Sequence, residues 1–255
     1  MLPHCEEVVK PMDVSPERSP QAAHTALLEH MSGKDVAEIG TRRGDGMLCF
    51  ALAARSALAI EVRPNYCSML EERAANWTAQ HEGQKSYSVL CQAFQEAPSI
   101  NASLYTWWQG PPHLNNIPAI CSLNKMQRLG RVPAHAEAMP LFDLKERADV
   151  RDLNHLKAKN IFSWTQSVAY DEKASCVAAG RKDCVRAHGS FIIGNVKLHD
   201  ERVAELCKPR GRRLAAARHS TPGTGVQIRG GLARVDAHAS SNWTDSAAST
   251  WEMWI

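Results

Sequence analysis

Short apolar runs alternate with longer stretches of helical spacing through the first two thirds of the chain. Runs rich in aliphatic and aromatic residues predict strands over 35–39, 57–62, 87–91, 103–108 and 138–143. The stretches between them place apolar residues on one helix face. They predict helices from Ser19-Pro20 to Gly33, over 44–55, from Pro64 onward, over 115–129 and over 144–158.

The end of this pattern is β-rich. Two further strands are predicted over 161–170 and 190–198, and the polar stretch 171–189 between them is too long for a tight hairpin. Strands that alternate with helices through right-handed crossovers form a doubly wound parallel sheet. The sequence therefore predicts an α/β fold with a doubly wound, mostly parallel seven-stranded sheet and an antiparallel terminal strand.

Three regions differ in composition. Residues 1–19 are expected to form an irregular N-terminal arm, and residues 20–199 carry the strand–helix pattern. Residues 200–255 are expected to form a basic, low-complexity, disordered tail, because Gly, Ser, Thr and Ala dominate there. From Lys208 onward there are seven Lys/Arg against three Asp/Glu, whereas residues 1–207 hold 23 against 24. The body therefore has no general attraction for nucleic acid, and only the tail suits such a contact.

Neither a membrane span nor a secretory signal is evident in the sequence. No run approaches the roughly 18–20 apolar residues that cross a bilayer, and residues 1–7 lack a basic region followed by an apolar one. The eight cysteines are scattered, with no pair at C-x-x-C spacing. We therefore expect reduced thiols in a cytoplasmic protein, without a disulfide frame, a metal site or membrane contact.

The stretch from Asp35 to Gly46 carries the strongest functional signal. A short strand runs into a turn with glycine at positions 40, 44 and 46, and the next strand ends in Glu61. Glycines let a backbone approach a ligand closely, and a carboxylate at the second strand's end can bind ribose, so this is nucleotide-binding geometry. A dinucleotide site fits poorly, because its second and third glycines would fall at Arg42 and Asp45.

The pattern Glu38-x-Gly40-x-x-x-Gly44, with Glu61 ending the next strand, resembles the cofactor site of class I S-adenosylmethionine-dependent methyltransferases. The likeness covers residues 20–199 by element order, and the turn itself is similar to that of FkbM-type methyltransferases. It implies a Rossmann-like methyltransferase fold with S-adenosylmethionine as cofactor. The cofactor-binding residues that it implies are Glu38, Gly40, Thr41, Gly44, Glu61, Gln92, Ala93 and Trp107.

Each implied role has a physical basis. Gly40 and Gly44 would let backbone amides approach the methionine part of the cofactor, and Gly44 would also open the next helix. Glu38 would accept a hydrogen bond from the ammonium group, directly or through water. Glu61 would accept from both ribose hydroxyls. Gln92 lies where this family often has an Asp beside the adenine, and an amide there can accept from the exocyclic amine and donate to a ring nitrogen.

Some features depart from the family pattern. Arg42 stands where many members have glycine, so its side chain must point away from the cofactor. The fourth strand ends in Trp107 and Trp108 instead of an acid. Side chains alternate between the two faces of a strand, so at least one of these rings is expected in the core. The other could line the cofactor or acceptor pocket. Residues 109–112, Gln-Gly-Pro-Pro, match the motif of amino-methylating enzymes only in part. His113 is the candidate general base, with an ordinary surface histidine as the alternative.

Three functions remain open at this point. The favoured one is methyl transfer from S-adenosylmethionine to an unidentified acceptor. A small-molecule acceptor is slightly favoured over a protein, because residues 1–207 are close to neutral. Such a transfer depends mainly on proximity and orientation, which fits a sequence without an evident triad or metal cluster. A non-catalytic methyltransferase-fold interaction module is the alternative, and an NAD-linked Rossmann oxidoreductase is less favoured. The sequence specifies neither the acceptor nor the oligomeric state.

Overall fold

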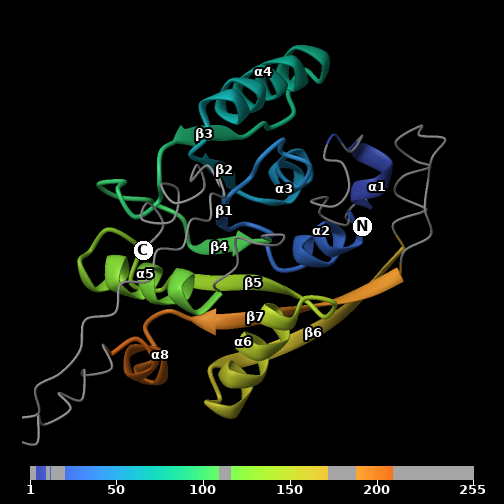
Figure 1. Ribbon diagram of the computed structural model, residues 1–255. Helices are drawn as coiled ribbons and strands as arrows, with labels where there is room; N and C mark the ends of the chain where they lie inside the picture. Colours follow the sequence, from blue (N-terminus) through green and yellow to red (C-terminus); the bar gives the residue numbers. More distant parts are fainter. Residues whose placement is uncertain (1–3, 10–11, 13–20, 109–115, 172–187, 209–255) are drawn as a thin grey trace, which may run out of the picture. The chain divides into compact units, whose positions relative to one another are not determined.

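Seven strands form one mixed sheet in the order β3-β2-β1-β4-β5-β7-β6 (Figure 1). Parallel pairs join β1 to β2 and β4, β2 to β3, and β4 to β5, whereas β7 runs antiparallel to β5 and β6. The predicted doubly wound sheet with an antiparallel terminal strand is confirmed. The strands are β1 (Asp35–Ile39), β2 (Ser56–Glu61), β3 (Ser88–Cys91), β4 (Leu104–Trp107), β5 (Glu137–Asp143), β6 (Phe162–Asp171) and β7 (His188–Lys197).

The computed structural model describes residues 4–9, 12, 21–108, 116–171 and 188–208. They belong to one unit, Met1–Lys208, and the second unit, Pro209–Ile255, lies outside the described residues. Over the ranges described, no helix has the length and apolar character needed to cross a membrane. The helices are α1 (Cys5–Val8), α2 (Gln21–Leu28), α3 (Met47–Ala53), α4 (Pro64–Gln80), α5 (Asn116–Arg128), α6 (Arg147–Ala158) and α8 (Glu201–Leu206).

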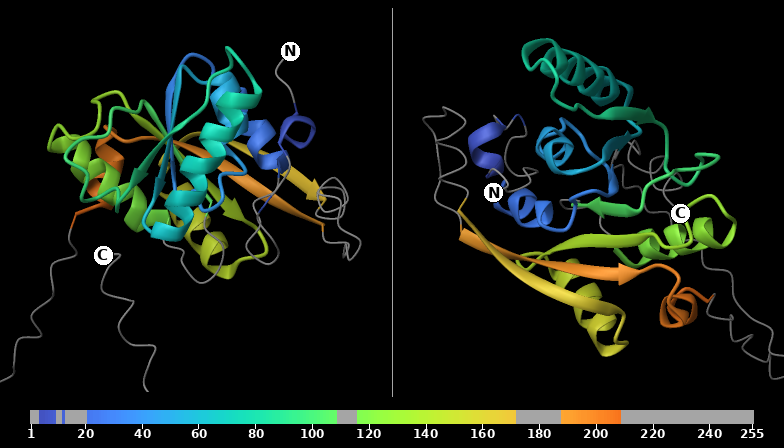
Figure 2. Two further views of the ribbon diagram at one scale, coloured as in Figure 1. Left: turned by 90° about the horizontal axis from the view of Figure 1, so that it is seen from above. Right: turned by 180° about the vertical axis from the view of Figure 1, so that it is seen from behind.

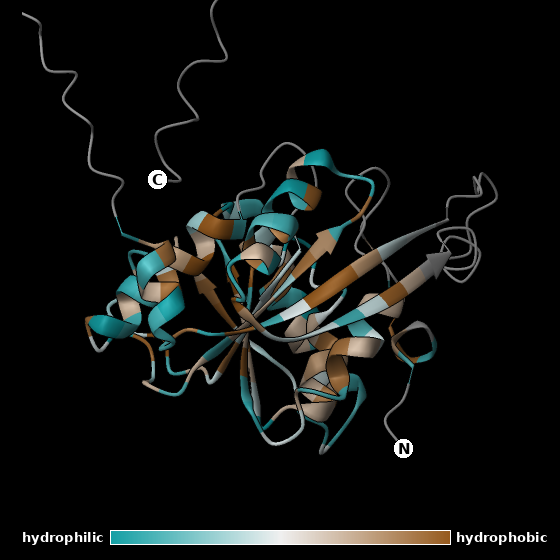
Figure 3. Cartoon of the chain, turned by 90° about the horizontal axis from the view of Figure 1, so that it is seen from below, coloured by the Kyte–Doolittle hydropathy of each residue, from teal (hydrophilic) through white to brown (hydrophobic). Residues whose placement is uncertain are grey.

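Apolar side chains pack on both faces of the sheet, and helices cover each face (Figure 2). Phe50 of α3 and Leu70 of α4 are fully buried on one face, and Ile120 of α5 and Leu156 of α6 are fully buried on the other. The central strands are largely coloured as hydrophobic in Figure 3. Burial on both faces explains why these strands read as continuous apolar runs in the sequence. Within the predicted helix over 44–55, apolar residues at helical spacing are buried: Met47, Leu48, Phe50, Ala51 and Ala54.

Some element boundaries differ from the prediction. Helix α3 begins at Met47, not at Gly44, because the intervening residues form turns in which Gly44 N donates to the Thr41 carbonyl at 3.0 Å. The expected irregular arm contains α1, and the expected tail begins with α8. Asp200 caps α8 by accepting from the backbone N–H of Arg202 at 2.8 Å, a preferred role of aspartate at a helix start.

Six cysteines form disulfides, so the prediction of reduced thiols is wrong for them. The partners lie 44, 24 and 86 residues apart, and no short spacing motif marks them. Because disulfides persist in oxidising compartments, the cysteines no longer support a cytoplasmic location. That location stays a prediction. Cys176 and Cys184 lie outside the described residues. The bonds are Cys5–Cys49 between α1 and α3, Cys67–Cys91 between α4 and β3, and Cys121–Cys207 between α5 and the residue after α8.

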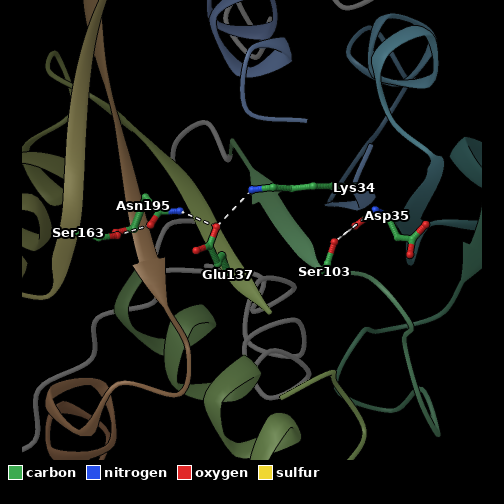
Figure 4. A network of polar contacts seen from close by, with 6 residues as sticks. All are labelled: Lys34, Asp35, Ser103, Glu137, Ser163 and Asn195. Carbon is green, nitrogen blue, oxygen red and sulfur yellow. Dashed lines mark hydrogen bonds and ion pairs between the residues drawn. The ribbon is translucent and has the colours of Figure 1, made fainter. Parts of the chain in front are cut away.

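A polar network links the amino-terminal side of β1 and β5 to β6 and β7 (Figure 4). Lys34 Nζ lies 3.3 Å from the Glu137 carboxylate, which also accepts from Asn195 Nδ2 at 3.2 Å. Ser163 Oγ donates to Asn195 Oδ1. These contacts hold strands together at the edge opposite to the carboxyl ends of β1 to β5. We therefore assign them a structural role.

Candidate functional site

The carboxyl ends of β1, β2, β3 and β4 meet at one edge of the sheet. Strands β1 and β4 are neighbours, although β2 and β3 separate them in the chain, so the strand order reverses between them. Open α/β sheets bind ligands at the carboxyl edge beside such a switch point. The glycine turn after β1, Glu61 at the end of β2, Gln92 after β3 and Trp107 at the end of β4 all lie at this edge.

Two glycines give the turn after β1 its shape. Gly40 and Gly44 adopt φ values of 73° and 80°, the left-handed region that other residues rarely enter. Gly40 N donates to the Ile60 carbonyl at 2.8 Å and so joins the turn to β2. A Cβ at Gly44 would lie 2.7 Å from Leu70 Cδ2 and 3.1 Å from Tyr87 Oη. The backbone conformation therefore favours glycine at both positions. At Gly44 a side chain would also collide with the buried side chains of Leu70 and Tyr87.

Glu61 is 5% exposed and its carboxylate binds backbone amides. Arg42 N donates to Oε2 at 2.9 Å, and Val62 N and Arg63 N donate to Oε1 at 2.8 and 3.0 Å. A carboxylate offers about four acceptor positions. The three amides leave room for about one ribose hydroxyl, where two were expected. The residue therefore fits a ribose contact and also holds the turn.

Arg42 occupies the left-handed region at φ 54°, a conformation that glycine adopts without the steric cost that a side chain brings. Its guanidinium Cζ lies 5.7 Å from the ring centroid of Tyr66 in the first turn of α4, and Nη2 lies 3.5 Å from Tyr66 Oη. The Arg63 guanidinium lies 5.8 Å from the same centroid. Cation–π contact thus directs the Arg42 side chain toward α4, while its amide faces Glu61.

Glu38 lies half-buried on β1, close to the start of α3. Its Oε1 would be 3.1 Å from a Cβ at Gly46, so this glycine leaves space for the carboxylate. Thr41 Oγ1 donates to the Glu38 carbonyl at 2.9 Å and fixes the backbone between β1 and the turn. Thr41 is itself buried, at 6% exposure, so its side chain supports the turn from within.

Gln92 and Ala93 follow β3 directly and are both half-buried. The strand register sets Cys91 opposite Glu61 and so brings Gln92 next to the end of β2. Among the described residues, the Gln92 side chain has no hydrogen-bond partner. Its amide therefore keeps its donor and acceptor positions unused within the described residues, and its contact with an adenine ring stays a prediction.

Trp107 lies in the core and is 1% exposed. Its Nε1 donates to Asn116 Oδ1 at 2.7 Å, and Asn116 Nδ2 donates to Asp149 Oδ1 at 2.9 Å. Trp108 is the half-buried member of the pair, on the other face, with its ring centroid 6.1 Å from that of Phe191. The structure thus assigns Trp107 a packing role and makes Trp108 the better candidate for a pocket wall.

Asp149 ties the start of α6 to the carboxyl end of β5. Its Oδ2 accepts from the backbone N–H of Asp143 at 2.8 Å. Burial raises the pKa of Asp149 to about 7, against the smaller opposing effect of that amide. Sequence reasoning missed both Asn116 and Asp149, because neither belongs to a short motif; only the fold brings them to Trp107.

The predicted general base His113 and the segment 109–112 lie outside the described residues. In the part of the chain that the structure describes, no group of three His, Cys, Asp or Glu residues could hold a metal ion. The described site consists of glycines, the carboxylates of Glu38 and Glu61 and the amide of Gln92, with the guanidinium groups of Arg42 and Arg63 beside Tyr66.

Comparisons with known proteins agree on the fold. No protein-family model matches the sequence, and no curated protein is significantly similar to it. A protein from Pyrococcus horikoshii assigned as an RNA methyltransferase superposes with a TM-score of 0.53 at 12% identity, over 75% of this chain and 93% of its own. Precorrin-6y C5,15-methyltransferase from Geobacter metallireducens gives 0.51 at 10% identity, over 74% and 94%. The chain therefore has the fold of class I S-adenosylmethionine-dependent methyltransferases.

Proposed function

We propose that the protein binds S-adenosylmethionine at the carboxyl edge of β1 to β3 and transfers its methyl group to an acceptor. The observation that carries the proposal is the contact between Arg42 N and the Glu61 carboxylate, which unites the glycine turn and the acid in one site. The side chains of Glu38, Glu61 and Gln92 supply hydrogen-bonding groups for an adenosyl sulfonium with an amino-acid tail, and Gly40, whose N–H binds the Ile60 carbonyl, gives the turn its shape.

The cofactor, when bound, supplies an electrophilic methyl group. The chain's own residues orient it: Glu61 holds a ribose hydroxyl, Gln92 contacts the adenine, and Glu38 lies on the side of the methionine tail. Catalysis then consists mainly of alignment with an acceptor and exclusion of water, which requires no metal or covalent intermediate. A small-molecule acceptor is favoured over a protein, because residues 1–207 are close to neutral.

The test compares Glu61→Gln with wild type by calorimetry, using S-adenosylhomocysteine and its 2′,3′-dideoxy analogue. The variant is expected to bind S-adenosylhomocysteine about tenfold more weakly, since a hydrogen bond to a charged acceptor is lost. The analogue should show a much smaller difference between the two proteins. Glu137→Gln, at the opposite edge of the sheet, is the control and should bind like wild type. An equal loss for both ligands would contradict a ribose contact.

A non-catalytic role for this fold is the second candidate. The strained Arg42 and the packing of Trp107 in the core, with no acid at the end of β4, favour it. Binding of S-adenosylmethionine without turnover against any acceptor would support this reading, because a binding module needs the pocket and no acceptor.

A further inference from the structure

We propose that the Cys67–Cys91 disulfide is a thiol–disulfide exchange site that sets the affinity for the adenosyl ligand. The inference rests on the proposed function and adds a mode of control to it. Cys67 lies in the first turn of α4, and its Sγ is 3.5 Å from the carbonyl oxygen of Glu61. Cys91 ends β3, opposite Glu61 in the strand register and one residue before Gln92. The bond thus joins the first turn of α4, beside the carbonyl oxygen of Glu61, to the end of β3, one residue before Gln92.

Strand β3 carries one end of this bond, whereas the other two disulfides of the described residues join helices or the residue after a helix. It is an edge strand of four residues that pairs only with β2. None of its residues is fully buried: Ser88 and Cys91 are exposed, and Val89 and Leu90 are half-buried. Apolar burial therefore contributes little to holding its carboxyl end. The disulfide, with Cα atoms 5.8 Å apart, supplies a covalent restraint at that end.

The two sulfurs differ in access. Cys67 is 5% exposed, whereas Cys91 is exposed at the surface. A dithiol reductant therefore attacks through its thiolate at Cys91 Sγ, and the bond to Cys67 breaks. Cys67 leaves as a thiolate and takes up a proton. The reductant's second thiol then resolves the mixed disulfide and releases Cys91 as a thiol, so that two electrons pass to the protein and the reductant becomes a disulfide.

The other disulfides provide an internal comparison. Cys5 and Cys49 are fully buried, which shields their bond from a reagent in solution. Cys121 and Cys207 are half-buried and join α5 to the end of α8, on the face of the sheet that does not carry the glycine turn. The Cys121–Cys207 bond is therefore accessible to a reagent but has no end in β2, β3 or the first turn of α4, and its reduction serves as the control.

Reduction is expected to weaken ligand binding. With the bond intact, Glu61 and Gln92 are held in the arrangement that contacts ribose and adenine, and the ligand does not have to order them. After reduction, the end of β3 gains freedom that the ligand must remove on binding. The affinity for S-adenosylhomocysteine should therefore fall by about tenfold in the dithiol form.

The experiment titrates the full chain with S-adenosylhomocysteine before and after treatment with dithiothreitol, and again after reoxidation with glutathione disulfide. Differential alkylation and mass spectrometry identify which cysteines were reduced. The Cys67→Ser/Cys91→Ser variant is expected to match the reduced protein, and Cys121→Ser/Cys207→Ser to match the oxidised one. Circular dichroism verifies that each variant is folded; if the first is not, the wild-type titrations and their reversal on reoxidation decide.

Two results would overturn the proposal. Equal affinity in the oxidised protein and in protein with Cys67 and Cys91 shown to be reduced would refute control by this bond and leave the proposed function intact. Failure of S-adenosylhomocysteine to bind any form would refute both proposals at once.

Discussion

The backbone N–H of Arg42 donates to Oε2 of Glu61 at 2.9 Å, across 19 residues of sequence. Through this bond the acid that ends β2 shapes the turn that leaves β1. Glu61 therefore has two roles in the candidate site, as the proposed contact to the ligand and as the acceptor that orders the turn. A substitution at Glu61 changes both, which is why a ligand without ribose hydroxyls is needed to separate the two effects.

Replacement of Gly44 by alanine should destabilise the fold strongly. The new Cβ would face Leu70 Cδ2 at 2.7 Å in a backbone of φ 80°, so strain and overpacking add to about 3 kcal/mol in the free energy of unfolding. Gly83→Ala is the matched control, since Gly83 has φ 78° and nothing within 4 Å of a Cβ. It should lose about 1 kcal/mol in urea unfolding. Equal losses would show that the packing around Gly44 is not tight.

Trp107→Phe should cost more stability than Trp108→Phe. Both changes remove an indole N–H, but Trp107 Nε1 binds buried Asn116, whereas Trp108 Nε1 has no hydrogen-bond partner within the described ranges. Loss of the donor leaves Asn116 Oδ1 unsatisfied, at a cost of about 1–3 kcal/mol beyond the common loss of ring volume. Chemical denaturation of the two variants measures the difference. If Trp108→Phe proves the more costly, the core role of Trp107 is wrong.

Asp149 should make stability depend on pH. Its pKa is raised from 3.8 to about 7 by burial, so the folded protein holds a proton that the unfolded chain releases. This contribution is fully present below pH 3.8 and is lost as pH rises through about 7, with a slope of up to about 1.4 kcal/mol per pH unit. Unfolding of wild type and Asp149→Asn at pH 5, 6 and 7 tests it. The wild type should lose more stability over this range; parallel curves would contradict a neutral Asp149.

The sheet was predictable because its central strands are buried on both faces and most strands are separated by helices of clear periodicity. The meeting of the glycine turn and Glu61 at one edge then follows from the parallel pairing of β1 with β2, whereas the strand order that places β1 beside β4 comes from the structure. The glycines at positions 40 and 44 were also predictable, because φ values of 73° and 80° exclude most other residues. These features depend on local pattern and on general rules of topology.

Contacts between distant residues were not predictable in the same way. The sequence places Cys67 and Cys91 in separate elements with no spacing motif, and only the pairing of β2 with β3 brings them together. Trp107 was expected at the cofactor because it ends a strand at the right edge; its direction depends on which face each residue of β4 presents. A one-residue shift in that alternation exchanges the roles of Trp107 and Trp108.

The central claim is that the turn after β1 and the acid ending β2 form one adenosyl site. Its most direct test is calorimetric titration of the intact, oxidised chain with S-adenosylhomocysteine and, separately, with NADH. The account predicts one saturable site for S-adenosylhomocysteine and no binding of NADH. No heat from S-adenosylhomocysteine at millimolar concentration, or tighter binding of NADH, would contradict it.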